Sequence, residues 1–154
     1  MDQVKTTAET LTLAAASRIV DEALAAGRAL KLKPLSVAVL DAGGHLVAFK
    51  REDNSGILRF EVAFGKAWGA LGLGRPSRGY EQVAKERPWF INSLVGASDG
   101  RLVPVAGGVL VKSAAGGIIG AVGISGDTSD NDEVCAIKGI QAVGLISEPE
   151  LPPA

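Results

Sequence analysis

The sequence contains a single cysteine, Cys135, and a single histidine, His45. One cysteine cannot close a disulfide within the chain, and its scarcity fits a reducing compartment. One residue of each kind is also too few for a conventional zinc site, which is built mainly from several Cys and His ligands. Neither cross-links nor a structural zinc ion is therefore expected to stabilise the fold.

An excess of charge of one sign is missing too. Sixteen Lys and Arg residues stand against seventeen Asp and Glu, for a net charge of −1. Nucleic-acid binding depends on clustered cations that meet phosphates, so that class of protein is not expected. No run of about 18 apolar residues argues for a transmembrane helix. The first residues lack a basic segment followed by an apolar one, so we expect no signal peptide and a cytoplasmic protein.

The sequence does contain enough apolar residues for a folded core, since 47% of its 154 residues are hydrophobic. At roughly 150 residues per domain, this length predicts one domain over residues 1–154. We expect its core at about residues 11–146. The segment 148–154 contains three prolines and is expected to be a frayed tail.

Hydrophobic periodicity predicts an α/β protein. Helices are expected where apolar residues recur at three- and four-residue steps: 13–30 after Thr12 as N-cap, 57–72, 80–94 with an interruption at Pro88, and 129–145 after Thr128. Strands are expected at 35–40 and 46–50, joined as a β-hairpin, and then at 101–105, 107–112 and 117–124. Hairpins at both ends with helices between them predict a mainly antiparallel sheet flanked by helices. Gly120 and Gly123 lie inside the last strand, which suggests that another segment approaches closely there.

Two glycine-rich loops are the strongest candidates for a binding site. One includes Gly107 and Gly108, and the other includes Gly126 and Asp127 just before a helix N-terminus. Exposed backbone N–H groups at such places can bind an anion. The alternative is that both loops are simply tight connections within a compact sheet.

Cationic side chains supply further candidates. Lys66 lies on the apolar face of a predicted helix, where its ammonium could bind an anion, act as a base if desolvated, or extend to solvent. Arg75 and Arg78 follow that helix, where they could recognise a carboxylate or phosphate or neutralise the helix dipole.

His45 and a pair of aromatic residues complete the candidates. His45 lies in a predicted hairpin turn, where it is either a solvated turn residue or a ligand to haem iron. Trp89 and Phe90 follow Pro88 and are either lids on the core or subunit contacts, the latter if they are exposed.

Five sequence segments, taken in order, resemble the GlcG/HbpS-like family, which is described as haem-degrading or haem-binding. The segments are Val39 to Ala48, Ala63 to Ala67 with Lys66, Gly74 to Ser77, Pro104 with Gly107 and Gly108, and Gly120 to Gly126 with Asp132 and Glu133. The resemblance covers roughly residues 11 to 146. It implies a profilin-like α/β/α sandwich, homo-oligomers from dimers to octamers, and haem as a possible cofactor.

The sequence departs from the family pattern at three places. Ala106 and Leu110 stand where prolines commonly flank the paired glycines, and Gly69 stands where a threonine commonly follows the helix lysine. These differences change the pocket that the resemblance implies.

Three hypotheses follow. The leading one is a small-ligand protein that binds haem or an organic anion between the Lys66 helix and the two glycine loops. Lys66 and Arg75 would neutralise the ligand's charge, and the amides of Gly107, Gly108, Gly126 and Asp127 would orient it.

The second hypothesis is an isomerase- or lyase-type enzyme that moves a proton on a small organic acid, with Lys66 as base or anchor. Asp132 or Glu133 would be its partner acid. The third is a ligand-free assembly module that relies on Trp89 and Phe90.

Overall fold

The computed structural model describes residues 9–153. Its elements are α1 (Leu13–Ala29), β1 (Ser36–Asp41), β2 (Leu46–Arg51), α2 (Arg59–Leu73), α3 (Arg78–Glu86), α4 (Pro88–Ala97), β3 (Gly108–Lys112), β4 (Ile118–Ser125), α5 (Ser129–Ala142) and β5 (Ile146–Glu148). The strands form one sheet in the order β2-β1-β4-β3-β5, and every neighbouring pair is antiparallel. The expected α/β class with a mainly antiparallel sheet is confirmed.

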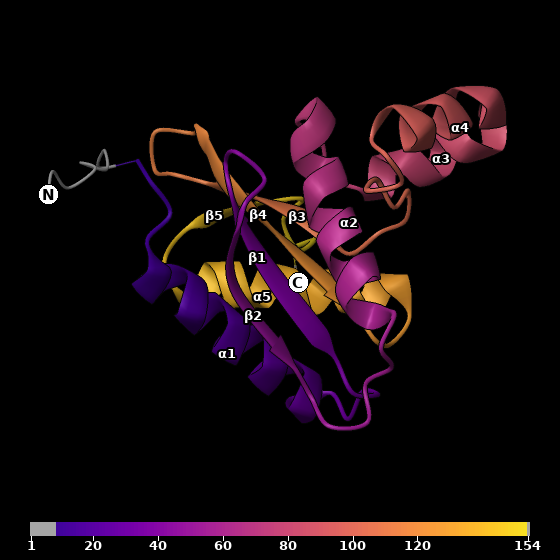
Figure 1. The fold of residues 1–154 in the computed structure, drawn as a ribbon. Helices are drawn as coiled ribbons and strands as arrows, with labels where there is room; N and C mark the ends of the chain where they lie inside the picture. The colour runs from indigo at the N-terminus through magenta and orange to yellow at the C-terminus, as the bar shows by residue number, and fades with distance from the viewer. Residues whose placement is uncertain (1–8, 154) are drawn as a thin grey trace, which may run out of the picture.

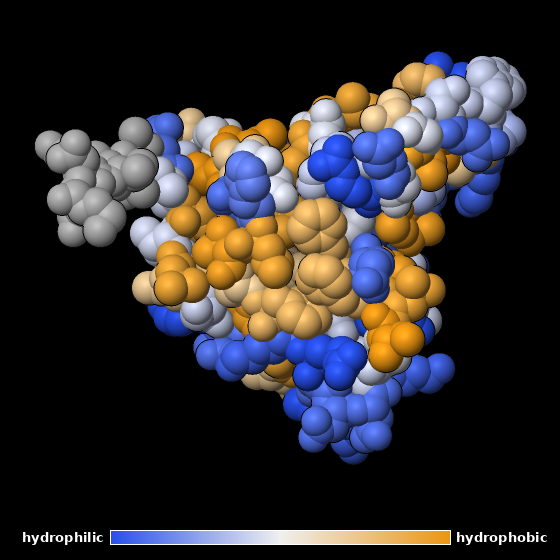
Figure 2. Space-filling model, viewed as in Figure 1, coloured by the Kyte–Doolittle hydropathy of each residue, from blue (hydrophilic) through white to orange (hydrophobic). Residues whose placement is uncertain are grey.

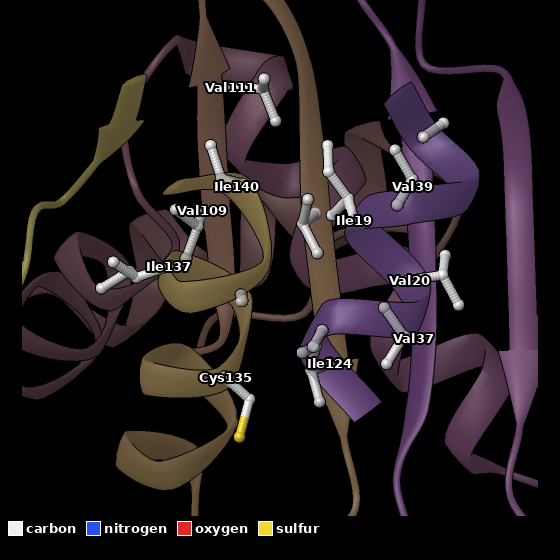
Figure 3. Close-up of a cluster of buried hydrophobic side chains, with 14 of the residues drawn as sticks. Ile19, Val20, Val37, Val39, Val109, Val111, Ile124, Cys135, Ile137 and Ile140 are labelled. Atoms are coloured by element: carbon white, nitrogen blue, oxygen red, sulfur yellow. The ribbon is translucent and has the colours of Figure 1, made fainter. Parts of the chain in front are cut away.

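Helices cover both faces of the sheet (Figure 1). Helices α1 and α5 pack together on one face, and α2 lies across the other. Strand side chains alternate between the two layers, because successive residues of a strand point to opposite faces. Val37 and Val39 of β1 join the cluster under α1 and α5, whereas Leu40 joins the cluster under α2. Figure 3 shows the larger of these two cores.

Side-chain caps fix the starts of α1 and α5 as the sequence predicts. The hydroxyl oxygen of Thr12 accepts a hydrogen bond from Ala15 N at 3.1 Å, and that of Thr128 accepts one from Asn131 N at 3.3 Å. Each bond satisfies one of the N–H groups that have no partner within the helix.

Glycines let the backbone of α2 lie directly on the sheet. Gly108 of β3 and Gly123 of β4 are opposite each other across the ladder. A Cβ atom added at Gly123 would lie 1.8 Å from the carbonyl oxygen of Ala63, and one added at Gly108 would lie 2.1 Å from that of Lys66. The close approach predicted from the glycine in β4 is therefore confirmed, and its partner is α2.

The structure corrects three details of the predicted elements. Residues 101–105 form no strand; they run as an irregular segment beside α2, where Val103 N donates to Gly65 O at 3.2 Å. The interrupted stretch around Pro88 is two helices, because Pro88 fits the first turn of α4 but could not continue α3. Glu148, expected in the frayed tail, belongs to β5 and pairs with Leu110 of β3.

Apolar side chains also reach the surface. Figure 2 shows them gathered on the face that carries β2 and the first half of α2, where Leu46, Ile57 and Leu58 are exposed. None of the helices within residues 9–153 is long and apolar enough to cross a bilayer.

Candidate functional site

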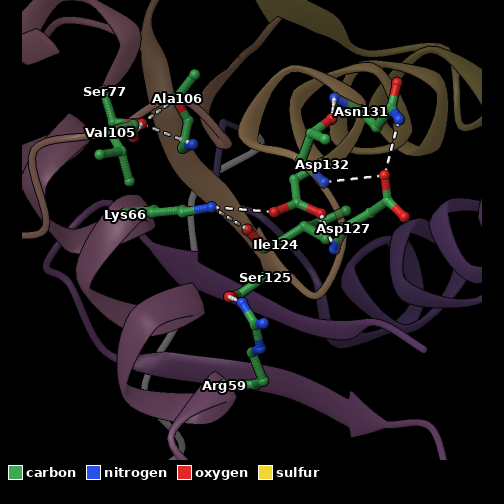
Figure 4. Close-up of polar contacts among 12 residues, drawn as sticks. Arg59, Lys66, Ser77, Val105, Ala106, Ile124, Ser125, Asp127, Asn131 and Asp132 are labelled. Atoms are coloured by element: carbon green, nitrogen blue, oxygen red, sulfur yellow. Dashed lines mark hydrogen bonds and ion pairs between the residues drawn. The ribbon is translucent and has the colours of Figure 1, made fainter. Parts of the chain in front are cut away.

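The residues of the two glycine loops and Lys66 do meet in space. Helix α2 brings Lys66 to the point where β4 ends and α5 begins (Figure 4). Its ammonium lies 3.1 Å from Asp132 Oδ2 and donates to Ile124 O at 2.9 Å. The Lys66 and Asp132 side chains are only 3% and 1% exposed. The two charges therefore form a buried ion pair.

Burial and pairing act in opposite directions on this pair. Loss of solvent lowers the pKa of Lys66, and the nearby Asp132 carboxylate partly offsets that change. Burial likewise raises the pKa of Asp132, against the attraction of the Lys66 ammonium. Removing either residue would leave the other as a buried charge without a counterion, which is strongly destabilising.

Two of the four loop amides assigned to a ligand have acceptors within the protein. Gly108 N donates to Ser77 Oγ at 2.7 Å, and Asp127 N donates to Asp132 Oδ1 at 3.0 Å. Gly107 has a φ of +117°, and a Cβ atom there would lie 2.9 Å from Lys66 Nζ. Side chains of the protein therefore occupy part of the site that the sequence assigns to a ligand between α2 and the loops.

Glu133, the other residue predicted as an acid, is also hydrogen-bonded within the protein. Arg78 Nε donates to both carboxylate oxygens of Glu133, at 2.9 and 3.1 Å, and Arg78 Nη2 donates to Asp130 Oδ1 at 2.6 Å. These hydrogen bonds raise the pKa of Arg78. They fasten the start of α3 to the start of α5. Glu133, like Asp132, is thus bound to a cation of the chain itself.

Arg75, which the sequence favoured over Arg78, does not reach this cluster. It is exposed, donates to Gly79 O at 3.0 Å, and lies 5.4 Å above the centre of the Tyr80 ring. The contact between Arg78 and α5 joins residues 55 positions apart, so no local sequence signal distinguished the two arginines.

His45 occupies the tight turn between β1 and β2. Asp41 Oδ1 organises this turn by accepting from Gly43 N at 2.9 Å and His45 N at 3.0 Å. The same oxygen lies 3.2 Å from His45 Nδ1. The imidazole is 81% exposed. A carboxylate at Nδ1 favours the tautomer whose Nε2 is free to bind a metal.

A cleft of about 370 Å³ lies beside this turn. It is lined by Glu9, Thr10, Asp41, Ala42, Gly43, His45, Ile118 and Ile119. Ile118 is exposed, and a Cβ atom at Gly74 would lie 3.8 Å from it, so the end of α2 reaches the same region. His45 thus lies at the edge of a partly apolar surface.

Trp68 extends that surface on the side of α2. A Cβ atom at Gly44 would lie 3.0 Å from Trp68 Nε1, so the turn rests against the indole. The guanidinium of Arg101 lies 4.2 Å from the centre of a Trp68 ring. Leu46, directly after His45, and Leu73, at the end of α2, are both exposed. One imidazole, one guanidinium and apolar side chains are therefore grouped at this end of the molecule.

The comparison with protein families identifies the chain. Residues 11–141 match the family described as haem degrading protein HbpS-like. This chain belongs to the HbpS-like family. The family resemblance noted from the five segments is confirmed.

Solved structures agree with this assignment. HbpS is 25% identical, with 90% of this chain and 93% of HbpS covered and a TM-score of 0.75. PduOC in complex with haem is 24% identical, with 89% and 97% covered and a TM-score of 0.79. Protein ORFY of Klebsiella pneumoniae is 23% identical, with 94% and 97% covered and a TM-score of 0.80. No curated protein matches the sequence significantly.

Of the candidate residues, His45 rather than Lys66 has the chemistry and exposure of a ligand to haem iron. Within residues 9–153, no three His, Cys, Asp or Glu side chains converge as a bare metal ion would require. Haem iron needs fewer protein ligands, because the porphyrin supplies four of its own, and a single imidazole is a common axial ligand. His45 has that imidazole exposed beside a partly apolar surface, whereas Lys66 is buried and paired with Asp132.

Proposed function

We propose that this protein binds haem, with His45 as the axial ligand and the cleft beside the β1–β2 turn as the binding surface. One observation carries the proposal: the only histidine of the chain is exposed, and its Nδ1 lies 3.2 Å from Asp41 Oδ1, which leaves Nε2 as the ring nitrogen for a ligand. Membership of a family described as haem-degrading adds to it.

Each neighbouring residue has a part in this proposal. Asp41 positions the imidazole, as carboxylates commonly do for metal-binding histidines. Ile118 and Ile119 offer apolar surface to the porphyrin. Arg101, above Trp68, supplies positive charge for a propionate. The bound haem would supply iron-centred redox and oxygen chemistry, which the side chains lack.

Titration with haem tests the proposal. The wild-type protein should produce a shifted Soret band with a defined stoichiometry. His45→Ala should weaken binding about 10-fold or more, in the range seen when metal-site residues are lost. Added imidazole should restore the wild-type spectrum to His45→Ala, because it replaces the missing ligand.

Lys138→Ala is the matched control, since Lys138 is exposed on α5, away from the turn. It should bind haem as the wild type does. The proposal is wrong if His45→Ala keeps both the wild-type spectrum and the wild-type affinity.

The geometry favours haem binding over proton-transfer catalysis on an organic acid. That alternative needs Lys66 with Asp132 or Glu133 in contact with substrate. Lys66 Nζ and Asp132 are bonded to each other, and Glu133 is bonded to Arg78.

A further inference from the structure

An apolar hollow of about 140 Å³ lies between α2 and α4. Its lining includes Trp68, Gly72 and Leu73 from α2 and Leu94 and Ala97 from α4. It is near the place where α3 and α4 project beyond the end of the sheet (Figure 1). None of its lining residues belongs to the cleft at the β1–β2 turn or to the buried ion pair of α2 and α5. Concave, mainly apolar surfaces of this kind are typical of small-molecule sites.

The polar side chains of the lining leave the hollow apolar. Ser98 is 5% exposed, and its hydroxyl donates to Val95 O at 3.0 Å and accepts from Leu102 N at 3.1 Å. The indole nitrogen of Trp68 lies beside the β1–β2 turn, since a Cβ atom at Gly44 would be 3.0 Å from it. A polar group buried without a hydrogen bond is costly, so the part of a ligand inside the hollow must be apolar.

Arg101 places a positive charge against two of the lining residues. Its guanidinium lies 4.2 Å from the centre of a Trp68 ring, and its Nε donates to Ser98 O at 2.9 Å. No carboxylate of residues 9–153 forms an ion pair with Arg101, and within the same residues its Nη1 and Nη2 have no hydrogen-bond acceptor. A guanidinium with free N–H groups binds a carboxylate through two parallel hydrogen bonds.

We propose that the hollow between α2 and α4 binds a carboxylic acid that carries a single aromatic ring, with the ring in the hollow and the carboxylate on Arg101. The volume agrees, because an apolar cavity of about 150 Å³ holds one benzene ring. Trp68 offers the ligand ring an aromatic neighbour. The unpaired guanidinium selects an anionic ligand over a neutral one of the same shape. Phenylacetate combines the two parts and serves as the probe.

Calorimetric titration of the haem-free protein tests the two parts of the ligand separately. Phenylacetate should bind about 10-fold more tightly than phenylacetamide, which lacks the charge, and more tightly than acetate, which lacks the ring. Arg101→Gln should weaken phenylacetate binding about 10-fold and leave phenylacetamide binding unchanged. Lys138→Gln is the matched control, because it removes a positive charge from α5, on the opposite face of the sheet from α2. It should bind phenylacetate as the wild type does.

A pair of leucine substitutions on α4 tests the position of the ring. Ala97→Leu adds apolar bulk at a residue that lines the hollow, and it should weaken phenylacetate binding about 10-fold. Gly96→Leu adds a side chain one residue earlier, at a position that does not line the hollow and where a Cβ atom would meet nothing within 4 Å. It should leave the affinity unchanged. Circular dichroism and melting temperature show that each variant folds.

The two tryptophans of the chain report where the ligand binds. Trp68 lines the hollow, whereas Trp89 does not and is 66% exposed at the other end of α4. A proton–nitrogen NMR spectrum therefore contains two indole N–H signals, which Trp89→Phe assigns by removing one of them. Phenylacetate should shift the signal of Trp68 in a saturable way and leave that of Trp89 in place.

The outcome does not depend on haem binding, because every titration uses haem-free protein and neither His45 nor the cleft beside it takes part. The proposal is overturned if phenylacetate shows no saturable binding at millimolar concentration, or binds no more tightly than phenylacetamide. It is also overturned if Ala97→Leu and Gly96→Leu have equal effects, or if binding leaves the Trp68 signal unmoved, since the ligand then occupies another surface.

Discussion

At the scale of single residues, the Lys66–Asp132 pair shows how a residue that resembles a catalytic group can be structural. A lysine on the apolar face of a helix has no nearby partner in the sequence; its counterion lies 66 positions away. Asp132 also accepts from Asp127 N, so one carboxylate joins α2, the β4–α5 loop and α5. The pair therefore fixes the relative positions of three segments.

Lys66→Met should lower the free energy of unfolding by about 3–5 kcal/mol at pH 7, because it leaves Asp132 buried without its cation. The deficit should shrink as the pH falls, since the isolated carboxyl then binds a proton more readily in the folded state than in the unfolded state. Urea denaturation at several pH values measures both effects.

The double variant Lys66→Met with Asp132→Asn is the control. It removes both charges but keeps an oxygen that can accept from Asp127 N. It should recover much of the lost stability. Equal losses in the single and double variants would show that the pairing of charges is not what matters.

The lowered pKa of Asp127 predicts that the stability of the fold depends on pH in the acid range. Hydrogen bonds from Asn131 Nδ2, Lys33 N and Thr128 N lower its pKa to about 2, from the usual value of 3.8. The unfolded state therefore binds the proton more readily, and this contribution to stability is complete above about pH 4 and is lost as the pH falls through about 2. Urea midpoints between pH 5 and pH 2 should fall less steeply for Asp127→Asn than for the wild type. Parallel curves would contradict this assignment.

At the scale of elements, the position of α2 depends on the absence of side chains beneath it. Gly108 and Gly123 allow backbone contact between α2 and the sheet, and Gly65 allows it on the other side, where a Cβ atom would lie 2.4 Å from Arg101 O. Side chains on α2, including Trp68 beside the His45 turn, are thereby held at a fixed height above the strands.

Gly123→Ala should therefore displace α2 and destabilise the protein by about 3 kcal/mol, at the upper end of the usual cost of overpacking. Gly72→Ala provides the comparison within α2, since its added Cβ atom would make only an ordinary contact, at 3.6 Å from Trp68 Cζ3. That variant should be more stable by roughly 0.5–1 kcal/mol, because alanine is the better helix former. Thermal or urea unfolding of the two variants should give changes of opposite sign.

Elements with strong local signals were predicted well, and those determined by distant partners were not. Periodicity and capping threonines located α1 and α5, and the Gly-Gly turn located the β1–β2 hairpin. Residues 101–105 alternate like a strand but lie beside α2, where no strand edge is available. Strand β5 has three residues and exists only because β3 pairs with it.

At the scale of the whole molecule, the sequence identified residues that lie close together in the fold, but it did not show that they bind one another. Lys66 comes from α2, Asp127 and Asp132 come from the loop and the helix that follow β4, and the three meet at one point. Sequence alone could not show that Asp132 accepts from both of the others, because that depends on distances between distant segments. His45, by contrast, could be placed from its local turn, and there it lies exposed.

The strand order has a consequence for synthesis on the ribosome. Strand β1 lies inside the sheet, with β2 on one side and β4 on the other, and its partner β4 ends only at Ser125. A nascent chain can close the β1–β2 hairpin early, but the second edge of β1 remains without a partner until β4 is translated, and β4 begins 67 residues after the end of β2. The growing polypeptide therefore carries an apolar, hydrogen-bonding edge through a long part of its elongation, and we expect chaperones to engage it during that interval.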